Sequence, residues 1–168
     1  MIFATAFAQN SRIDLNPQAP KSLVNVDNFT EFSTTFSFQT LYSEDITTSE
    51  GTFSNIFIDG ESVMSGNIGD PNLPIINRII AIPEGSTPVV SIKGYSESEY
   101  TLADYNIKTI SPRQLSPRKD ANFDTIQYRI NREAYSKNTF SEHDIATVEV
   151  LGHIRGLRIA RLSISPVT

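Results

Sequence analysis

The fold class is decided by residues 145–167, which read IATVEVLGHIRGLRIARLSISPV. β-Branched and other apolar side chains recur along this stretch, and Gly156 divides it into two runs. The pattern predicts two adjacent β-strands. The alternation changes phase between Ile159 and Leu162, so we expect a β-bulge near Ala160–Arg161.

Short strand patterns of the same kind occupy most of the remaining chain. They lie at residues 21–27, 33–42, 51–58, 63–64, 73–83, 88–96, 99–110 and 126–135. The stretch 99–110 is ambiguous, since Tyr100, Leu102 and Tyr105 also fit a helical turn. The run LPIINRIIAIP is the most apolar, and Pro74 and Pro83 bound it as a buried strand. With turn signals between the strands, the sequence predicts an all-β fold, an antiparallel β-sandwich of two packed sheets.

The composition suits a single folded domain with a sizeable core: the chain has 168 residues, of which 39% are hydrophobic and 20% charged. No apolar run approaches the roughly 18 residues that a membrane span needs. The sequence contains no cysteine. We therefore exclude disulfides, zinc–thiolate sites, iron–sulfur clusters and a cysteine nucleophile within this chain.

Charge is distributed unevenly along the sequence. Residues 1–100 carry 4 Lys/Arg against 12 Asp/Glu, a balance of −8, and residues 101–168 carry 10 against 7, a balance of +3, which together give the net charge of −5. A nucleic-acid-binding face needs a dense set of basic side chains, because phosphate contacts dominate such affinities. The dispersed basic residues of this chain argue against that class and favour a protein partner.

The N-terminus indicates export. Ala6-Phe7-Ala8 followed by Gln9 has the small side chains that signal peptidase requires, although the usual basic n-region is missing. We interpret residues 1–8 as the remnant of a signal peptide and residues 9–21 as a flexible lead-in. An ordinary apolar N-terminus is the alternative.

The sequence offers no convincing catalytic or metal site. His143 and His153 are the only histidines, and neither belongs to an HxH or HExxH motif, so we interpret both as structural or surface residues. Residue types alone leave a Ser–His–Asp triad open, but the sequence has no GxSxG motif and no glycine-rich phosphate loop. We expect no catalytic residue, no metal and no cofactor in this chain.

Residues 111–125, SPRQLSPRKDANFDT, interrupt the strand patterns. Two Ser-Pro steps and few apolar side chains predict an exposed loop. The loop carries Arg113, Arg118 and Lys119. By themselves these residues are most simply interpreted as a solvated basic loop.

Two stretches taken together resemble the propeptide family of gingipain-type cysteine peptidases. Residues 66–95 are similar to the family's G-x-P-x-LP … IP-x-G frame, and residues 145–167 are similar to its RG … P-V end. The matching residues are Gly69, Pro71, Leu73, Pro74, Pro83, Gly85, Arg155 and Gly156. Glycines and prolines at these positions also fit plain turn geometry, and the resemblance covers residues 22–168.

The resemblance implies the N-terminal pro-region of a secreted peptidase that cleaves after Arg or Lys. Such a region assists folding of the catalytic domain and blocks its cleft until it is removed. The partner would be the catalytic domain of the cognate cysteine peptidase, which would carry the catalytic Cys and His. Family members are exported by Bacteroidetes-like cells, and their pro-regions usually continue past the P-V element. The chain would then be a fragment whose last sheet is truncated at the C-terminal end.

The resemblance also suggests a role for the basic loop. A peptidase specific for Arg or Lys has an acidic pocket, which attracts a guanidinium or ammonium group through charge-assisted hydrogen bonds. Arg118 and Lys119 follow Pro117 at the expected tip of the loop. Arg118 is therefore our first candidate for the inhibitory or maturation residue, Lys119 the second and Arg113 the third.

Two other functions compete with the pro-region. One is a non-catalytic cell-surface binding module for carbohydrate or protein, in which Tyr95, Tyr100 and Tyr105 would form an aromatic platform. The other is a structural domain attached to a peptidase that has lost its activity.

Overall fold

The structure is a computed structural model that describes residues 10–16, 21–59, 63–64, 66–116, 128–137, 139–140 and 143–168. Its strands are β1 (Asn10–Asp14), β2 (Ser22–Asp27), β3 (Phe32–Phe36), β4 (Thr40–Thr48), β5 (Gly51–Ile58), β6 (Val63–Met64), β7 (Pro74–Ala81), β8 (Ala146–Ile154) and β9 (Leu157–Ile164). The described helical segments are a 3₁₀ turn, η1 (Leu102–Tyr105), and one short helix, α1 (Arg132–Ser136). Neither is long enough to cross a membrane.

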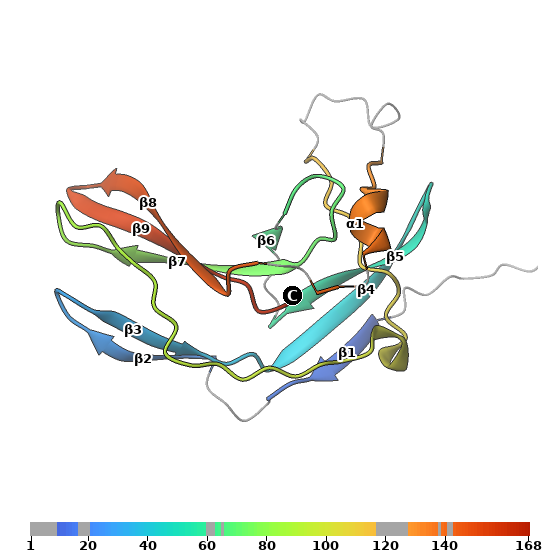
Figure 1. The fold of residues 1–168 in the computed structure, drawn as a ribbon, viewed down its shortest axis with the longest axis horizontal. Helices are drawn as coiled ribbons and strands as arrows, with labels where there is room; N and C mark the ends of the chain where they lie inside the picture. The colour runs from blue at the N-terminus through green and yellow to red at the C-terminus, as the bar shows by residue number, and fades with distance from the viewer. Residues whose placement is uncertain are drawn as a thin grey trace, which may run out of the picture.

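The strands pair in three antiparallel sheets, which confirms the predicted all-β fold. The sheets have the orders β1-β4-β5, β2-β3 and β6-β7-β9-β8. Figure 1 shows the four-stranded sheet as one layer and the two smaller sheets as the layer facing it. The second layer of the expected sandwich is therefore divided between two sheets.

The two layers meet in a small aliphatic core. Ile58 of β5, Ile76 of β7 and Ile164 of β9 form one buried cluster. A second cluster joins the β1-β4-β5 sheet to two other segments, the one between β6 and β7 and the one just after η1. Its members are Ile13, Leu41, Ile56, Leu73 and Ile107. Leu15 and Val167 pack against both clusters, so the core is continuous.

The stretch at 145–167 forms the β8–β9 hairpin. Arg155 and Gly156 are its two turn residues, with φ of 50° and 79°. Two successive positive φ values define the turn type whose twist matches paired strands. The register shift lies in β8, between Val150 and Gly152, so the bulge expected in β9 was wrong. No bulge is needed in β9, because Ala160 and Ile164 face the core while Leu157, 62% exposed, lies on the opposite face.

Residues 10–14, which the sequence placed in a flexible lead-in, form strand β1. They pair with the edge of β4, and Ile13 lies opposite Leu41. Ile13 is only 2% exposed. The segment is ordered because β4 offers an unpaired edge and the core accepts one apolar side chain, neither of which the local sequence reveals.

The expected strand at 33–42 is divided by a contact from far along the chain. The Asp59 carboxylate accepts hydrogen bonds from the backbone N–H groups of Gln39 (3.0 Å) and Thr40 (2.9 Å). The chain therefore bends between β3 and β4. After Asp59 the expected return strand, β6, pairs with β7 instead of β5.

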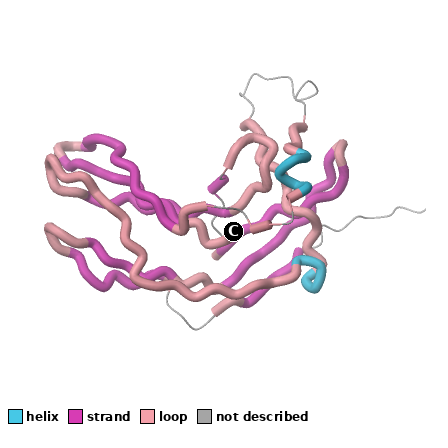
Figure 2. The backbone as a smooth tube through the Cα atoms, in the orientation of Figure 1, coloured by secondary structure: helices cyan, strands magenta, loops and turns pink. Residues whose placement is uncertain are grey.

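The strands expected at 88–96, at 99–110 and over the described residues 128–135 are wrong, whereas the alternative of a helical turn within 99–110 agrees with the structure. Residues 87–100 form a connector without regular structure, which crosses from the four-stranded sheet to the other layer (Figure 2). β6 pairs only with Pro74 and Ile75 of β7, and the connector pairs with no described strand. Residues 102–105 form η1, and Asn131 starts α1 by accepting a hydrogen bond from the Ala134 N–H (3.3 Å).

The burial of Ile13 predicts that β1 is part of the stable fold. Ile13→Ala should lower the free energy of unfolding by about 2–5 kcal/mol, because it leaves a cavity in the core. Ile79→Ala, at a position 59% exposed, is the matched control and should cost less than about 1 kcal/mol. Urea unfolding measures both, and equal effects would show that β1 does not stabilise the fold.

Candidate functional site

The candidate site is the base from which the basic loop leaves the fold. Residues 117–127, with Arg118 and Lys119, lie outside the described residues. The described chain leads up to them through residues 111–116 and returns through residues 128–131. We call these two segments, together with the turn 66–72 between them, the loop stem; it projects beside α1 in Figure 1.

Gly69 joins the two limbs of the loop stem. Its N–H donates to the Arg113 carbonyl (2.8 Å), and its own carbonyl accepts from the Asn131 N–H (2.9 Å). Its φ is +92°, and a Cβ added there would lie 3.0 Å from the Asn131 nitrogen. Only glycine combines this backbone conformation with so close an approach.

Asp70 ties the same limbs together with its backbone and its carboxylate. Its carbonyl accepts from the Arg113 N–H (2.8 Å), and its carboxylate accepts from the side-chain amides of Asn131 (2.7 Å) and Asn67 (3.1 Å). The hydrogen bond from Asn131 is the main cause that lowers the pKa of the Asp70 carboxyl. The carboxylate form is therefore the one that the loop stem stabilises.

The first limb is anchored on β5. Ser54, at the centre of that strand, receives the N–H of Ser111 (2.8 Å) on its carbonyl and donates its own N–H to the Thr109 carbonyl (2.9 Å). Pro71 and Pro112 form an isolated antiparallel bridge. The base of the first limb is therefore held on the sheet by backbone hydrogen bonds.

The second limb is held by two tyrosines. The Tyr135 hydroxyl of α1 donates to the Ile110 carbonyl (2.7 Å). Tyr128 packs its ring against Phe53 of β5, with centroids 5.9 Å apart. Burial raises the pKa of both phenols, so both are neutral at physiological pH.

Gln114 and Arg129 form the outermost described link between the limbs. The Gln114 amide nitrogen donates to the Arg129 carbonyl (2.8 Å), and the Gln114 amide oxygen accepts from the Arg129 N–H (2.9 Å). The amide nitrogen also contacts the Pro112 carbonyl (3.1 Å). Beyond this link begin the residues that carry Arg118 and Lys119.

Arg113 lies in the loop stem, half-buried, and its guanidinium donates to the Gly66 carbonyl. With its backbone bonded to Gly69 and Asp70, the residue braces the turn 66–72. Leu73 is buried in the core, and Pro74 begins β7 opposite Met64. Pro71 and Gly69 thus belong to the loop stem, whereas Leu73 and Pro74 start the sheet below it.

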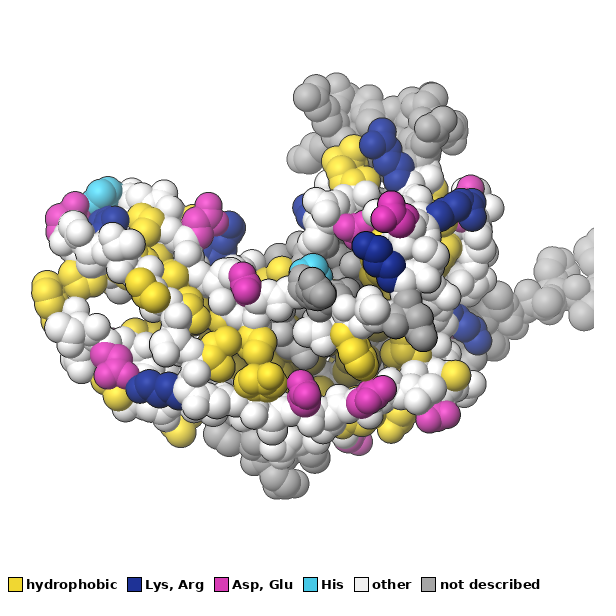
Figure 3. All heavy atoms as spheres, in the orientation of Figure 1, with side chains coloured by type: hydrophobic (Ala, Val, Ile, Leu, Met, Phe, Trp, Pro, Cys, Tyr) yellow, Lys and Arg dark blue, Asp and Glu magenta, His cyan; other side chains and the backbone are white. Residues whose placement is uncertain are grey.

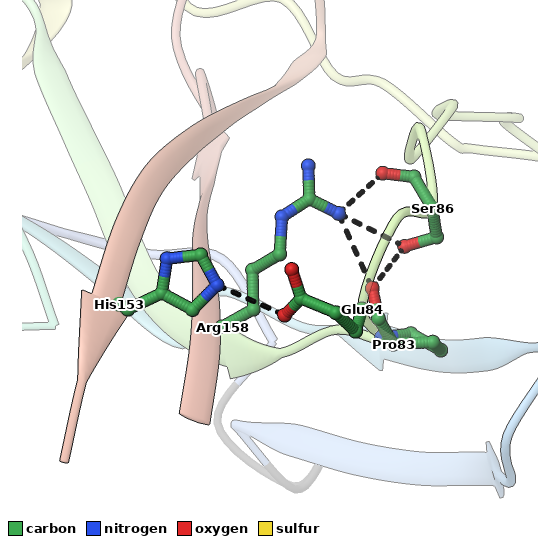
Figure 4. A network of polar contacts seen from close by, with 5 residues as sticks. All are labelled: Pro83, Glu84, Ser86, His153 and Arg158. Carbon is green, nitrogen blue, oxygen red and sulfur yellow. Dashed lines mark hydrogen bonds and ion pairs between the residues drawn. The ribbon is translucent and has the colours of Figure 1, made fainter. Parts of the chain in front are cut away.

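Pro83 and Gly85 belong to a second structure, the turn that ends β7. The Ser86 N–H donates to the Pro83 carbonyl (3.2 Å), and Gly85 has a φ of +73° with open space around its Cα. Arg158 of β9 donates to the carbonyls of Pro83 (3.2 Å) and Ser86 (2.5 Å), as Figure 4 shows. These residues fix the start of the connector 87–100.

The histidines do not form a catalytic or metal site in the described part of the chain. His153 contacts Glu84 (2.9 Å) at the surface (Figure 4). His143 lines a cavity of about 270 Å³ with Asp144 and Ser163. The Ser163 hydroxyl donates to the side-chain amide oxygen of Asn77 (2.8 Å) and not to an imidazole. The described residues contain no group of three or more acidic or imidazole side chains able to hold a metal ion.

The expected tyrosine platform is not formed. Tyr100 and Tyr105 contact each other edge to face, with centroids 6.0 Å apart, and pack against the core. Tyr95, 66% exposed, lies apart from them on the connector. Figure 3 instead shows a hollow between the β2–β3 and β8–β9 hairpins with hydrophobic side chains along its opening.

Sequence reasoning missed Gln114, Asp70 and Asn131. Asn131 carries a local signal, since asparagine before Arg-Glu-Ala is a good helix N-cap. Asp70 in a Gly-Asp-Pro turn also fits a turn residue. Nothing local points to Gln114, because its partner lies 15 residues away in the sequence.

The geometry at Gly69 predicts unequal effects at two glycines with positive φ. Alanine at either position should cost about 1–2 kcal/mol through backbone strain. Gly69→Ala should cost more than Gly85→Ala, because only the first Cβ meets backbone atoms. Urea unfolding compares the two variants, and equal losses of stability would contradict the proposed close approach.

The lowered pKa of Asp70 predicts a pH-dependent role for Asn131. A carboxyl whose pKa is lowered by folding stabilises the fold above its ordinary pKa, and that contribution is lost as the pH falls through the lowered value. Asn131→Ala should therefore destabilise the chain by about 1 kcal/mol at pH 7, and by less below about pH 3. Urea unfolding across this range tests the effect, which a pH-independent difference would refute.

Comparison with known proteins agrees with this geometry. The chain is 34% identical over 161 residues to Lys-gingipain HG66 of Porphyromonas gingivalis and 33% identical to Lys-gingipain W83 of the same organism. Each alignment covers 96% of this chain and 9% of the relative, so the chain spans less than a tenth of the length of these proteins.

Two solved structures share the fold. The first is a structure that addresses the zymogenic latency of gingipain K from Porphyromonas gingivalis. It superposes on this chain with a TM-score of 0.87 at 32% sequence identity, and the match covers 94% of this chain and 86% of that chain. The second is a complex of the pro- and mature domains of RgpB from the same organism, with a TM-score of 0.64 at 22% identity over 89% of this chain and 74% of that one. The Propeptide_C25 family model matches residues 9–168, and this chain is therefore a member of the Propeptide_C25 family.

Proposed function

We propose that this chain is the pro-region of a secreted cysteine peptidase that cleaves after Lys or Arg, and that it keeps the peptidase inactive by occupying its cleft. The partner is the catalytic domain of the same precursor, which carries the catalytic Cys and His. The pro-region also assists folding of that domain. Family membership supports the general role, and the single observation that carries the inhibitory mechanism is the loop stem.

The loop stem supports inhibition because it presents the basic loop from a braced base. Gly69, Asp70 and Gln114 connect the two limbs at successive levels, and Ser54 anchors one limb to β5. An inhibitor binds more tightly when its binding segment is held in place before association, because less conformational entropy is lost. A loop with unlinked ends would have to be ordered by the peptidase itself.

The charge of the loop fits an acidic specificity pocket. Arg118 and Lys119 follow each other directly in the sequence. Arg113, the third candidate, already donates its guanidinium to Gly66 within the loop stem. We therefore assign the cleft-binding role to Arg118 or Lys119 and a bracing role to Arg113. Either cation, once inserted, would also present a peptide bond for cleavage during maturation.

Export belongs to the same proposal. The relatives are gingipains, and the start of this chain, residues 1–8, has the composition expected of the end of a signal peptide. The carbohydrate-binding alternative loses its main support, because two of its three tyrosines pack against the core.

The inhibitory role of the loop predicts a specific loss of affinity. Arg118→Ala combined with Lys119→Ala should raise the inhibition constant for the mature peptidase domain of its own precursor at least tenfold, about 1.4 kcal/mol. The cause is the loss of charge-assisted hydrogen bonds in the acidic pocket. Steady-state inhibition of peptide cleavage measures this constant.

The matched control is Arg132→Ala combined with Lys137→Ala, which removes the same charge from exposed positions of α1 and its C-cap. Arg132 makes only an exposed contact with Glu50 (3.4 Å), so stability should change little. A similar loss of inhibition in both double variants would indicate long-range attraction. An unchanged inhibition constant in the loop variant would reject the assigned role.

A further inference from the structure

The side-chain amide of Gln114 joins the two limbs of the loop stem. It bonds the backbone of the opposite limb as the backbone of a neighbouring strand would. The amide pairs with both the N–H and the carbonyl of Arg129, at 2.9 and 2.8 Å. In an antiparallel ladder, the N–H and the carbonyl of one residue make the same two bonds to the residue opposite it. The carboxamide is the neutral side-chain group that donates and accepts in this arrangement.

The fold explains why a side chain is needed at this level. One residue nearer the base, the N–H and carbonyl of Arg113 are already bonded to Asp70 and Gly69. The turn 66–72 therefore lies between the limbs and keeps their backbones apart. Gln114 is the first residue beyond this turn, and its side chain spans the remaining gap to Arg129.

The link also closes the segment of sequence that carries Arg118 and Lys119. Fourteen residues, 115–128, separate Gln114 from Arg129, and Arg118 and Lys119 lie among them. Fixing the ends of a loop reduces the conformations available to it before binding. The Gln114 amide also contacts the Pro112 carbonyl (3.1 Å), which orients the amide on its own limb.

We propose that Gln114 is a positioning residue for inhibition: its amide clamps the ends of the basic loop and so presents the inhibitory cation to the peptidase cleft. This inference rests on the proposed function, because it takes the loop as the inhibitory element. Gln114 contacts only its own chain, and its effect on the peptidase passes entirely through the loop.

Gln114→Glu is the sharpest variant, because it changes the hydrogen-bonding pattern and preserves the shape. At neutral pH the carboxylate cannot donate to the carbonyls of Arg129 and Pro112, and its negative charge is repelled by both carbonyl oxygens. We therefore expect the side chain to leave this position, so that the Arg129 N–H loses its acceptor as well. Asn25→Asp is the matched control, since it makes the same amide-to-carboxylate change at an exposed position of β2, far from the loop stem.

Two measurements on the full chain test the clamp. Hydrogen exchange followed by NMR should show the protection of the Arg129 amide falling at least fivefold in Q114E at pH 7. It should recover below about pH 4, where the protonated carboxyl donates again. Global unfolding in urea should stay close to wild type, and N25D should leave the Arg129 amide unchanged. Unchanged Arg129 protection in Q114E, or equal loss across all amides, overturns the clamp.

The third measurement is a double-mutant cycle with the mature peptidase domain of the precursor, its catalytic cysteine replaced so that no cleavage occurs. Q114E alone should weaken binding at least tenfold, and it should add less than twofold in the R118A/K119A background, because both changes act on the same contact. If R118A/K119A weakens binding and Q114E does not, or if the two effects multiply, the positioning role is wrong. If R118A/K119A has no effect, the proposed function fails, and Arg129 protection alone decides whether the clamp exists.

Discussion

The backbone of Gly69 is the constraint on which the candidate site depends. Its N–H and carbonyl are bonded to different limbs of the loop stem, at Arg113 and Asn131. This arrangement places three backbone segments within hydrogen-bond distance of one another, and the middle one has no room for a side chain. The carboxylate of Asp70 and the amide of Gln114 then strengthen a geometry that the glycine makes available.

The loop stem is well braced because it rises from the best-packed part of the molecule. Ser54, fully buried, connects it to β5, and Leu73 leads from it directly into the core. The hairpins at the other end are less buried: Leu23 and Val24 of β2 and Ile154 of β8 are each more than half exposed. Regions with few buried apolar contacts open more readily than the core. Rigidity is therefore concentrated at the end of the fold that carries the basic loop.

This distribution suits the proposed role, in which the chain occupies the cleft of a peptidase. Inhibition by occlusion requires a segment held in a fixed position and a scaffold that resists distortion, and both are properties of packing and hydrogen bonding. The described residues supply them through backbone bonds at Gly69 and side-chain bonds at Asp70 and Gln114.

The sequence by itself determined the all-β class, strand β7 and the strands β8 and β9, because each depends on a local pattern. An apolar run bounded by Pro74 and Pro83, and two β-branched-rich runs separated by Gly156, indicate strands from the residues alone. Tertiary structure decided the rest. Residues 88–96 alternate like a strand, yet they pair with no described strand and instead connect the two layers. Residues 10–14 seemed unremarkable in sequence, yet they form a strand on the free edge of β4. The clamp at Gln114 depends on a residue 15 positions away, and its geometry exists only after the turn 66–72 has separated the limbs. Pairing partners and long-range hydrogen bonds belong to the whole fold, so no local pattern of side chains encodes them.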